Sequence, residues 1–255
     1  MSTVLLRYRY AWLLFFVVIT TKEGRALETK DWGQAWSEGQ IGFHRDDVNP
    51  LLINYWPTLA ADEDESVLVP LSGKTVDMIW LARQHRNVYG SELVEQAVAS
   101  FFADNTLQPV PTQTETHVWW KAENITIIQG DFFIIPAGSL VDVTAFYDRA
   151  ALVALPSEQQ PAYVAAMMAM APELKHGLLI TLDYAPVLAG GPPYAVSPDT
   201  VDLLYGQWFD IKLLGSAPPE RIPSRMAGAD VSSLVEHAFW LTRKPAPAER
   251  MNRSV

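Results

Sequence analysis

Short apolar runs alternate with segments of helical spacing along most of the chain. The run from Ser66 to Pro70 is short and continuously apolar, which is typical of a strand buried on both faces of a sheet. Asn49 followed by Pro50 predicts a helix start, because asparagine caps helices and proline is tolerated at the first helical position. Since proline lacks a backbone N–H, we expect Pro57 to bend or end that helix.

The same periodicity predicts further elements downstream. We expect helices at 31–38, 75–84, 94–102, 156–170 and from 197 onward, and strands at 87–91, 125–128, 141–147, 178–184, 209–214 and 235–242. Residues 105–115 are polar and contain prolines, so we expect a loop there. Because helices and strands take turns along the chain, the pattern predicts the α/β class, with a mostly parallel sheet covered by helices on both faces.

The first 27 residues differ from the rest of the chain. Arg7 and Arg9 precede an apolar run at 10–19, as in a signal peptide. The run is shorter than the roughly 20 residues that a membrane-spanning helix needs, and residues 24–26 match a cleavage site poorly. The alternatives are a short apolar leader or anchor, and a disordered extension or start artefact, which we favour. We expect one domain at 28–243 and a disordered tail at 244–255.

Charge and residue content exclude several classes of function. The chain has 19 basic and 29 acidic residues, so a broad electrostatic surface for nucleic acid or anionic lipid is not expected. It contains no cysteine, which excludes thiolate nucleophiles and cysteine-based zinc sites. Its five histidines have no H-x-x-x-H spacing, and we expect no metal site. The expected ligand is therefore a small molecule that is neutral or cationic.

The turns after the first two strands indicate what kind of ligand binds. Gly73 lies in the first turn, but Leu68 stands where a phosphate loop needs glycine, and no G-x-G-x-x-G motif is present. Glu92 ends the second strand, 19 residues after Gly73, where an acid can accept hydrogen bonds from ribose hydroxyls. A site that binds a ribose but no phosphate is the kind of site that an adenosyl cofactor needs. The alternative is that Glu92 is a solvated carboxylate at a helix start.

Aromatic and charged residues supply two more candidate groups. Trp32 and Trp36 are four residues apart and share a helix face. With Phe43 they could close over a ligand, and aromatic faces attract a cation such as a sulfonium; the alternative is that they belong to the core. Asp148 and Arg149 directly follow an apolar run, which places them at the ligand edge of the sheet, although a structural ion pair would give the same pattern.

Together these stretches resemble the thiopurine S-methyltransferase family, in particular its bacterial branch. The resemblance runs in order from about Trp32 to Leu241. Its motifs are GQIGFH at 39–44, NPLL at 49–52, VLVPLSGKTVDM at 67–78, GSEL at 90–93, GDFF at 130–133, YDRAALVALP at 147–156, LITLDY at 179–184 and GPPY at 191–194. The resemblance implies a Rossmann-like class I methyltransferase fold with a seven-stranded sheet, whose last strand is antiparallel, and S-adenosylmethionine as cofactor.

The resemblance also implies roles for particular residues. Those that would bind the cofactor are Trp32, Trp36, Phe43, Leu71, Glu92, Asp131, Phe132 and Arg149. Those that would bind the substrate are Phe43, Arg149 and Arg225. Asp148 and Arg149 are the expected catalytic pair, in which the arginine favours an ionised acceptor and the aspartate orients it or handles a proton.

The expected reaction is in-line transfer of a methyl group to a thiopurine or another aromatic or heterocyclic thiol. Two alternatives stay open: methylation of tellurite or selenium species for detoxification, and a cofactor-binding protein without turnover, held at a membrane by residues 10–19. We expect a small-molecule thiol substrate, no nucleic-acid partner, a cytoplasmic location and a monomer.

Overall fold

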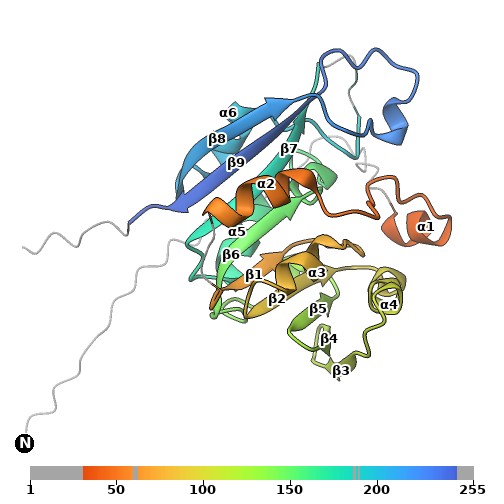
Figure 1. The fold of residues 1–255 in the computed structure, drawn as a ribbon, viewed down its shortest axis with the longest axis vertical. Coiled ribbons are helices and arrows are strands. Elements are labelled where there is room, and N and C mark those ends of the chain that lie inside the picture. Colours follow the sequence, from red (N-terminus) through yellow and green to blue (C-terminus); the bar gives the residue numbers. More distant parts are fainter. Residues whose placement is uncertain (1–30, 60–62, 186–187, 189, 246–255) are drawn as a thin grey trace, which may run out of the picture.

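The computed structural model describes residues 31–59, 63–185, 188 and 190–245, and a single twisted sheet runs through them (Figure 1). Its strands are β1 Ser66–Val69, β2 Asn87–Glu92, β3 Val110–Gln113, β4 Val118–Ala122, β5 Ile125–Gln129, β6 Val143–Arg149, β7 His176–Asp183, β8 Phe209–Ala217 and β9 Val235–Arg243. Their order across the sheet is β3-β4-β5-β2-β1-β6-β7-β9-β8.

Strand directions confirm the predicted fold class. Strands β5, β2, β1, β6 and β7 pair in parallel, and β9 lies antiparallel between β7 and β8. These seven strands are the expected sheet, including its antiparallel last strand. Two further strands, β3 and β4, extend the sheet beyond β5 in antiparallel pairing, so the described sheet has nine strands rather than seven.

The prediction of a loop at 105–115 is wrong for its second half, because strand β3 occupies residues 110–113. All four residues of β3 are exposed, so the strand lacks the apolar alternation that predicts strands. It contains Pro111, which an edge strand tolerates because one of its sides has no partner. Tertiary pairing with β4, rather than local pattern, makes this segment a strand.

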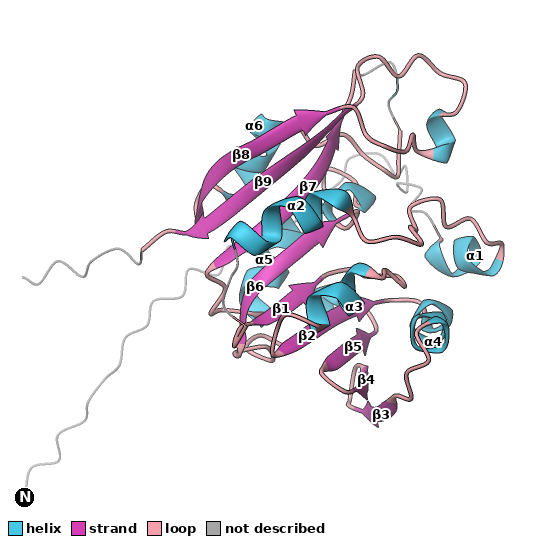
Figure 2. Ribbon diagram, viewed as in Figure 1, coloured by secondary structure: helices cyan, strands magenta, loops and turns pink. Residues whose placement is uncertain are grey.

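Helices cover both faces of the sheet (Figure 2). They are α1 Trp32–Ser37, α2 Pro50–Leu59, α3 Asp77–Ala82, α4 Glu95–Asp104, α5 Gln160–Met170 and α6 Pro198–Tyr205. Because side chains alternate along a strand, Val67 and Val69 pack with α2, α3 and α4, whereas Leu68 packs with α5 and α6. The two core layers therefore meet at β1, as its continuously apolar sequence predicts.

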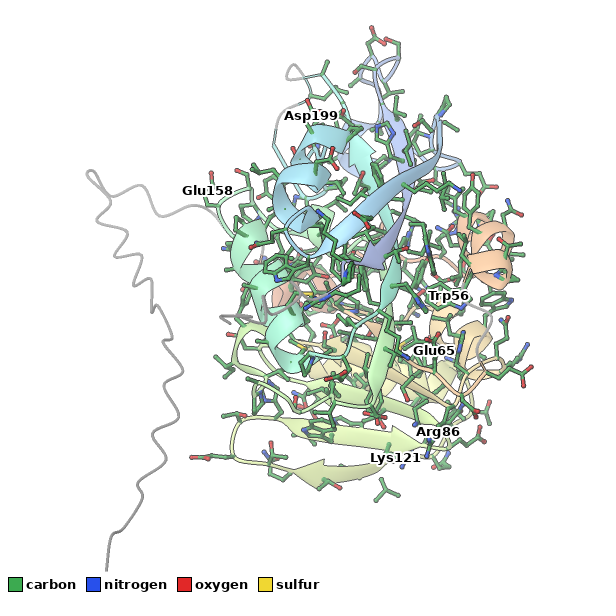
Figure 3. All side chains as sticks on the ribbon, turned by 90° about the vertical axis from the view of Figure 1, so that its left-hand side faces the viewer. Trp56, Glu65, Arg86, Lys121, Glu158 and Asp199 are labelled. Carbon is green, nitrogen blue, oxygen red and sulfur yellow. The ribbon has the colours of Figure 1, made fainter. Side chains whose placement is uncertain are left out.

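Helix α2 begins as predicted but does not end where expected. The side-chain carbonyl of Asn49 accepts a hydrogen bond from the backbone N–H of Leu51 at 2.8 Å, which confirms the cap. The helix continues through Pro57 to Leu59, so the expectation that Pro57 ends it is wrong. Trp56, which is fully buried and donates to a ring nitrogen of His85, holds this last turn against the sheet (Figure 3). That packing outweighs the loss of one backbone hydrogen bond at an exposed proline.

The predictions for residues 1–27 and for most of the tail at 244–255 lie outside the described residues. In the part of the chain that the structure describes, no helix is both long enough and apolar enough to cross a membrane.

Gly177 allows β7 to pack closely beneath an aromatic ring. It pairs with Phe146 of β6, which is fully buried. A Cβ atom added at Gly177 would lie 2.2 Å from a ring carbon of Phe146. This is far shorter than a van der Waals contact, so any side chain there must displace the ring or the strand.

We therefore predict that Gly177→Ala lowers the free energy of unfolding by about 1–3 kcal/mol, the usual cost of overpacking a core. Urea unfolding of the purified variant would measure it. Leu203→Ala is the control, because Leu203 is 81% exposed and its loss should change stability little. Equal stability of the two variants would contradict the prediction.

Candidate active site

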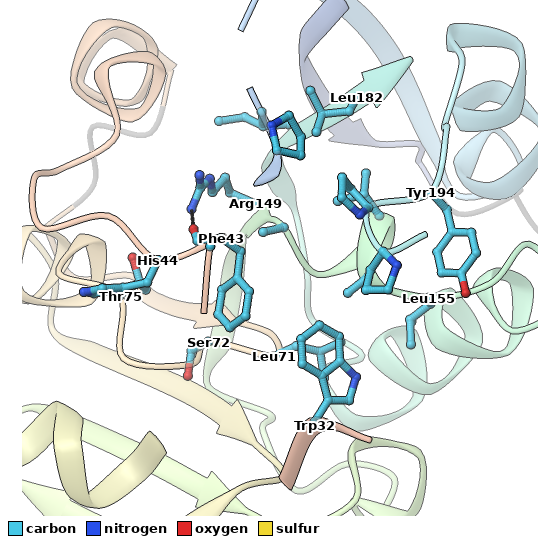
Figure 4. Close-up of a pocket in the computed structure, with 18 of the residues that line it drawn as sticks. Trp32, Phe43, His44, Leu71, Ser72, Thr75, Arg149, Leu155, Leu182 and Tyr194 are labelled. Carbon is cyan, nitrogen blue, oxygen red and sulfur yellow. Dashed lines mark hydrogen bonds between the residues drawn. The ribbon is translucent and has the colours of Figure 1, made fainter. Parts of the chain in front are cut away.

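A cavity of about 770 Å³ opens at the carboxyl ends of the parallel strands (Figure 4). This size is typical of a site for a small organic ligand. Its walls come from α1 and the segment that follows it, from the loop after β1, from the ends of β2, β6 and β7, and from loops at 192–194 and 219–225. No cluster of three metal-ligating side chains occurs among the described residues. The cavity lies at the sheet edge where the fold class predicts a ligand.

The loop after β1 bends back onto the end of β2. Leu71 and Gly73 both have positive φ, at 45° and 55°. The backbone N–H of Ser72 donates to the carbonyl of Ser91 at 2.7 Å, and the N–H of Leu71 donates to the Ser91 hydroxyl at 3.0 Å. These contacts hold the loop backbone against the floor of the cavity. A ligand can thus approach the main chain closely, as the single glycine indicated.

Glu92 lines the cavity and is 7% exposed, so the alternative of a solvated carboxylate is wrong. Its two oxygens accept backbone N–H groups from Gly73 and Val94, each at 2.8 Å. Burial raises the pKa of the Glu92 carboxyl, and these two hydrogen bonds oppose that rise. Because each carboxylate oxygen can accept two hydrogen bonds, Glu92 keeps acceptor capacity for a ligand while its position stays fixed.

The predicted aromatic residues meet over the loop that follows β1. Helix α1 starts at Asp31, whose side chain accepts the N–H of Gln34. The rings of Trp32 and Trp36 meet the Phe43 ring edge-on, with centroid distances of 5.6 and 6.1 Å. All three aromatic residues line the cavity, and Figure 4 shows Trp32 and Phe43 at its wall.

Asp131 and Phe132 lie on the loop after β5 and also line the cavity. The Asp131 carboxylate accepts the N–H of Phe133, which starts a short 3-10 turn. Phe132 is buried and stacks on Tyr163 of α5, with ring centroids 4.9 Å apart. A ring nitrogen of His117 lies 2.9 Å from the Asp131 carbonyl oxygen. Because His117 directly precedes β4, the added strands support this loop.

Arg149 and Arg225 both line the cavity, but they are held differently. One guanidinium N–H of Arg149 donates to the Phe43 carbonyl at 2.9 Å (Figure 4), and its other N–H groups have no hydrogen-bond partner in the part of the chain that the structure describes. Arg225 is exposed and donates to the Tyr184 hydroxyl and to the carbonyls of Leu188 and Pro193. Arg225 thus ties together the loops at the cavity mouth.

Asp148 is the one predicted site residue that does not line the cavity. It is fully buried, and its carboxylate accepts the Tyr163 hydroxyl at 2.7 Å and the N–H of Leu152 at 3.2 Å. Neighbouring residues of a strand point to opposite faces, so Asp148 and Arg149 diverge from the end of β6. The structure does not bring this expected catalytic pair together. Burial raises the pKa of Asp148 to about 6.

Three acidic residues of the cavity were missed by the sequence analysis, namely Asp77, Glu158 and Glu236. Asp77 accepts the Tyr147 hydroxyl at 2.9 Å and the N–H of Asn49 at 2.8 Å. Glu236 is the second residue of β9. Because β9 is antiparallel, its first residues lie beside the carboxyl ends of the other strands. The position of Glu236 at the cavity follows from the direction of β9, which the hydrophobic pattern of the sequence does not predict.

The chain is similar in sequence to known methyltransferases. Residues 27–244 match the family model described as thiopurine S-methyltransferase. The thiopurine S-methyltransferase of Shewanella frigidimarina (strain NCIMB 400) is 41% identical over 218 residues, which is 86% of this chain and 100% of that protein. That of Shewanella pealeana (strain ATCC 700345 / ANG-SQ1) is 41% identical over 213 residues, 84% of this chain and 97% of that protein.

Solved structures share the fold at low sequence identity. A SAM-dependent methyltransferase from Anabaena variabilis ATCC 29413 has a TM-score of 0.58 and 12% identity, over 84% of this chain and 93% of that chain. Magnesium protoporphyrin IX methyltransferase from Synechocystis PCC 6803, solved with bound SAH, has a TM-score of 0.55 and 12% identity, over 83% of this chain and 95% of that chain. These similarities confirm the α/β methyltransferase fold.

Burial of Asp148 generates a prediction about pH and stability. Its pKa in the folded chain is about 6, above the ordinary value of 3.8, so the folded state binds the proton more tightly than the unfolded state. Stability then falls as pH rises through this window. Relative to wild type, the free energy of unfolding of Asp148→Asn should rise by about 2–3 kcal/mol between about pH 4 and pH 6. Urea unfolding across this range would measure it, and a difference that does not change with pH would contradict it.

Proposed function

The chain belongs to the thiopurine S-methyltransferase family, and we propose which of its side chains hold the methyl donor and which hold the thiol that accepts the methyl group. It is an S-adenosylmethionine-dependent thiopurine S-methyltransferase. The observation that carries the proposal is that Trp32, Glu92, Asp131 and Arg149, from four separate segments, line one cavity. In this proposal residues 28–243 form one domain, and its cavity holds the methyl donor and the thiol acceptor together.

The volume of the cavity and its polar groups suit S-adenosylmethionine. Glu92 offers fixed carboxylate oxygens to the ribose hydroxyls beside the closely approaching backbone of the loop after β1. Asp131 and Phe132 would hold the adenine from the loop after β5. The rings of Trp32 and Trp36 would face the cationic sulfonium. When bound, the cofactor supplies a methyl group activated by that sulfonium.

The acceptor thiol would lie at the end of the cavity where Arg149 and Phe43 meet. The guanidinium of Arg149 favours an ionised thiol by nearby positive charge, and the Phe43 ring provides an apolar wall for the heterocycle. Holding two reactants in line can lower the barrier by about 7–11 kcal/mol relative to free reactants. Positioning by this wall and this charge is therefore the main contribution of the chain to rate.

Arg225 and Asp148 act in this proposal as positioning residues. The three hydrogen bonds of Arg225 shape the mouth through which the acceptor enters. Asp148 holds the hydroxyl of Tyr163, and Tyr163 stacks on Phe132 at the adenine wall. The aspartate thus supports the cofactor side of the cavity from behind and takes no proton from the acceptor.

We predict that Glu92→Gln raises the dissociation constants of S-adenosylmethionine and S-adenosylhomocysteine about 10- to 100-fold, because hydrogen bonds to a charged group contribute roughly 1.5–3 kcal/mol. Isothermal titration calorimetry measures both constants. Glu95→Gln is the matched control, since Glu95 is exposed in the first turn of α4 and lies outside the cavity. Unchanged constants in Glu92→Gln would remove the ribose role.

We also predict that Arg149→Ala lowers kcat/KM for a thiopurine about 10- to 100-fold, the expected loss of one charge-assisted contact. Steady-state methyl transfer measures this loss. Arg83→Ala removes an exposed arginine outside the cavity and should keep wild-type kcat/KM. If Arg149→Ala matches that control, Arg149 does not contact the acceptor.

A further inference from the structure

Glu236 differs from the other acidic side chains that line the cavity. Asp77, Glu92 and Asp131 each accept hydrogen bonds from backbone N–H groups, and the exposed Glu158 accepts the Ser157 hydroxyl. Among the described residues, none donates a hydrogen bond to Glu236 or forms an ion pair with it. Its carboxyl group is therefore available to a ligand in the cavity.

Four charged or titratable groups lie close enough to Glu236 to interact with it electrostatically. They are Arg149 and Tyr147 of β6, Arg45 of the segment after α1, and Glu220 of the segment after β8. Burial raises the pKa of Glu236, the two arginines lower it, and Glu220 raises it. Its nearest strand partners, Leu182 of β7 and Ala217 of β8, carry no charge.

Arg45 strengthens the polar character of this end of the cavity. Its guanidinium pairs with Glu220 at 2.7 Å and with Asp47 at 3.0 Å, although Arg45 itself is buried. Its Nε–H has no hydrogen-bond partner among the described groups. The acceptor end thus combines a free carboxyl group, the Arg149 guanidinium and one unpaired buried donor.

We propose that Glu236 is the general base that takes the proton from a neutral thiol acceptor. The S–H bond breaks, its proton passes to a Glu236 carboxylate oxygen, and the sulfur uses the freed electron pair to bond to the methyl carbon. The methyl–sulfonium bond breaks at the same time, and its electrons neutralise the sulfonium. Glu236 later returns the proton to water. This inference rests on the proposed function. It extends the range of acceptor substrates to thiols that are un-ionised at neutral pH.

Chemistry gives Glu236 and Arg149 complementary roles. A positive charge beside the sulfur favours the thiolate but cannot accept its proton. A carboxylate within the same cavity can accept it, and general base catalysis contributes typically 10²–10⁴-fold. The partial burial that raises the pKa of Glu236 also makes it a better base near neutral pH.

The test compares two thiols in Glu236→Gln: an aryl thiol that is ionised at neutral pH and an alkyl thiol that is not. We expect kcat/KM for the alkyl thiol to fall about 100-fold or more, as for loss of a general base, while the aryl thiol keeps nearly wild-type kcat/KM. With the alkyl thiol, wild type should lose activity as pH falls through the Glu236 pKa. In the variant, activity should instead follow the ionised fraction of the thiol.

Two control variants check that the selective loss belongs to the Glu236 carboxylate. Glu95→Gln neutralises an exposed carboxylate that lies outside the cavity and should change neither substrate's kcat/KM. His44→Gln removes the imidazole that lines the cavity beside Asp46. An equal loss for both thiols in Glu236→Gln, or the selective loss in His44→Gln instead, would overturn the inference. Wild-type protein that binds no S-adenosylmethionine by calorimetry would instead refute the proposed function.

Discussion

The contact between the loop after β1 and the end of β2 determines the shape of the cavity. Two residues with positive φ turn the chain, and N–H groups at 71–73 donate to Ser91 and to the Glu92 carboxylate. A buried carboxylate is costly unless it is hydrogen-bonded, so loop and strand each need the other. The floor of the cavity and the group that would hold the ribose are therefore one structural unit.

The remaining walls are supported from behind by polar groups buried in the core. Asp148 holds Tyr163, which stacks on Phe132, and His117 contacts the backbone carbonyl of Asp131. Gly130 lies so close to His117 that an added Cβ would be 2.5 Å from the ring. The cofactor wall is thus held by α5 on one side and by the chain entering β4 on the other.

Local chemistry explains which features the sequence could predict. The helix start at Asn49, the buried strand β1 and Glu92 at the end of β2 depend on neighbouring residues, and the structure places them as expected. The exposed strand β3 depends on pairing with β4, and the persistence of α2 past Pro57 depends on burial of Trp56; neither is visible in a local pattern.

The same distinction applies to the site. Trp32 and Trp36 could be proposed because helical spacing puts them on one face, and both meet the Phe43 ring in the structure. Asp148 was paired with Arg149 because they are adjacent in sequence, but alternation along β6 separates them. Glu236 lies more than 80 residues beyond that pair, and only the reversed direction of β9 brings it to the same cavity. The hydrogen bond from Arg149 to the Phe43 carbonyl joins the aromatic wall of the cavity to its positive charge. A substitution that displaces the backbone at Phe43 would therefore also displace the guanidinium, so the form of the acceptor end and its electrostatics cannot be altered independently.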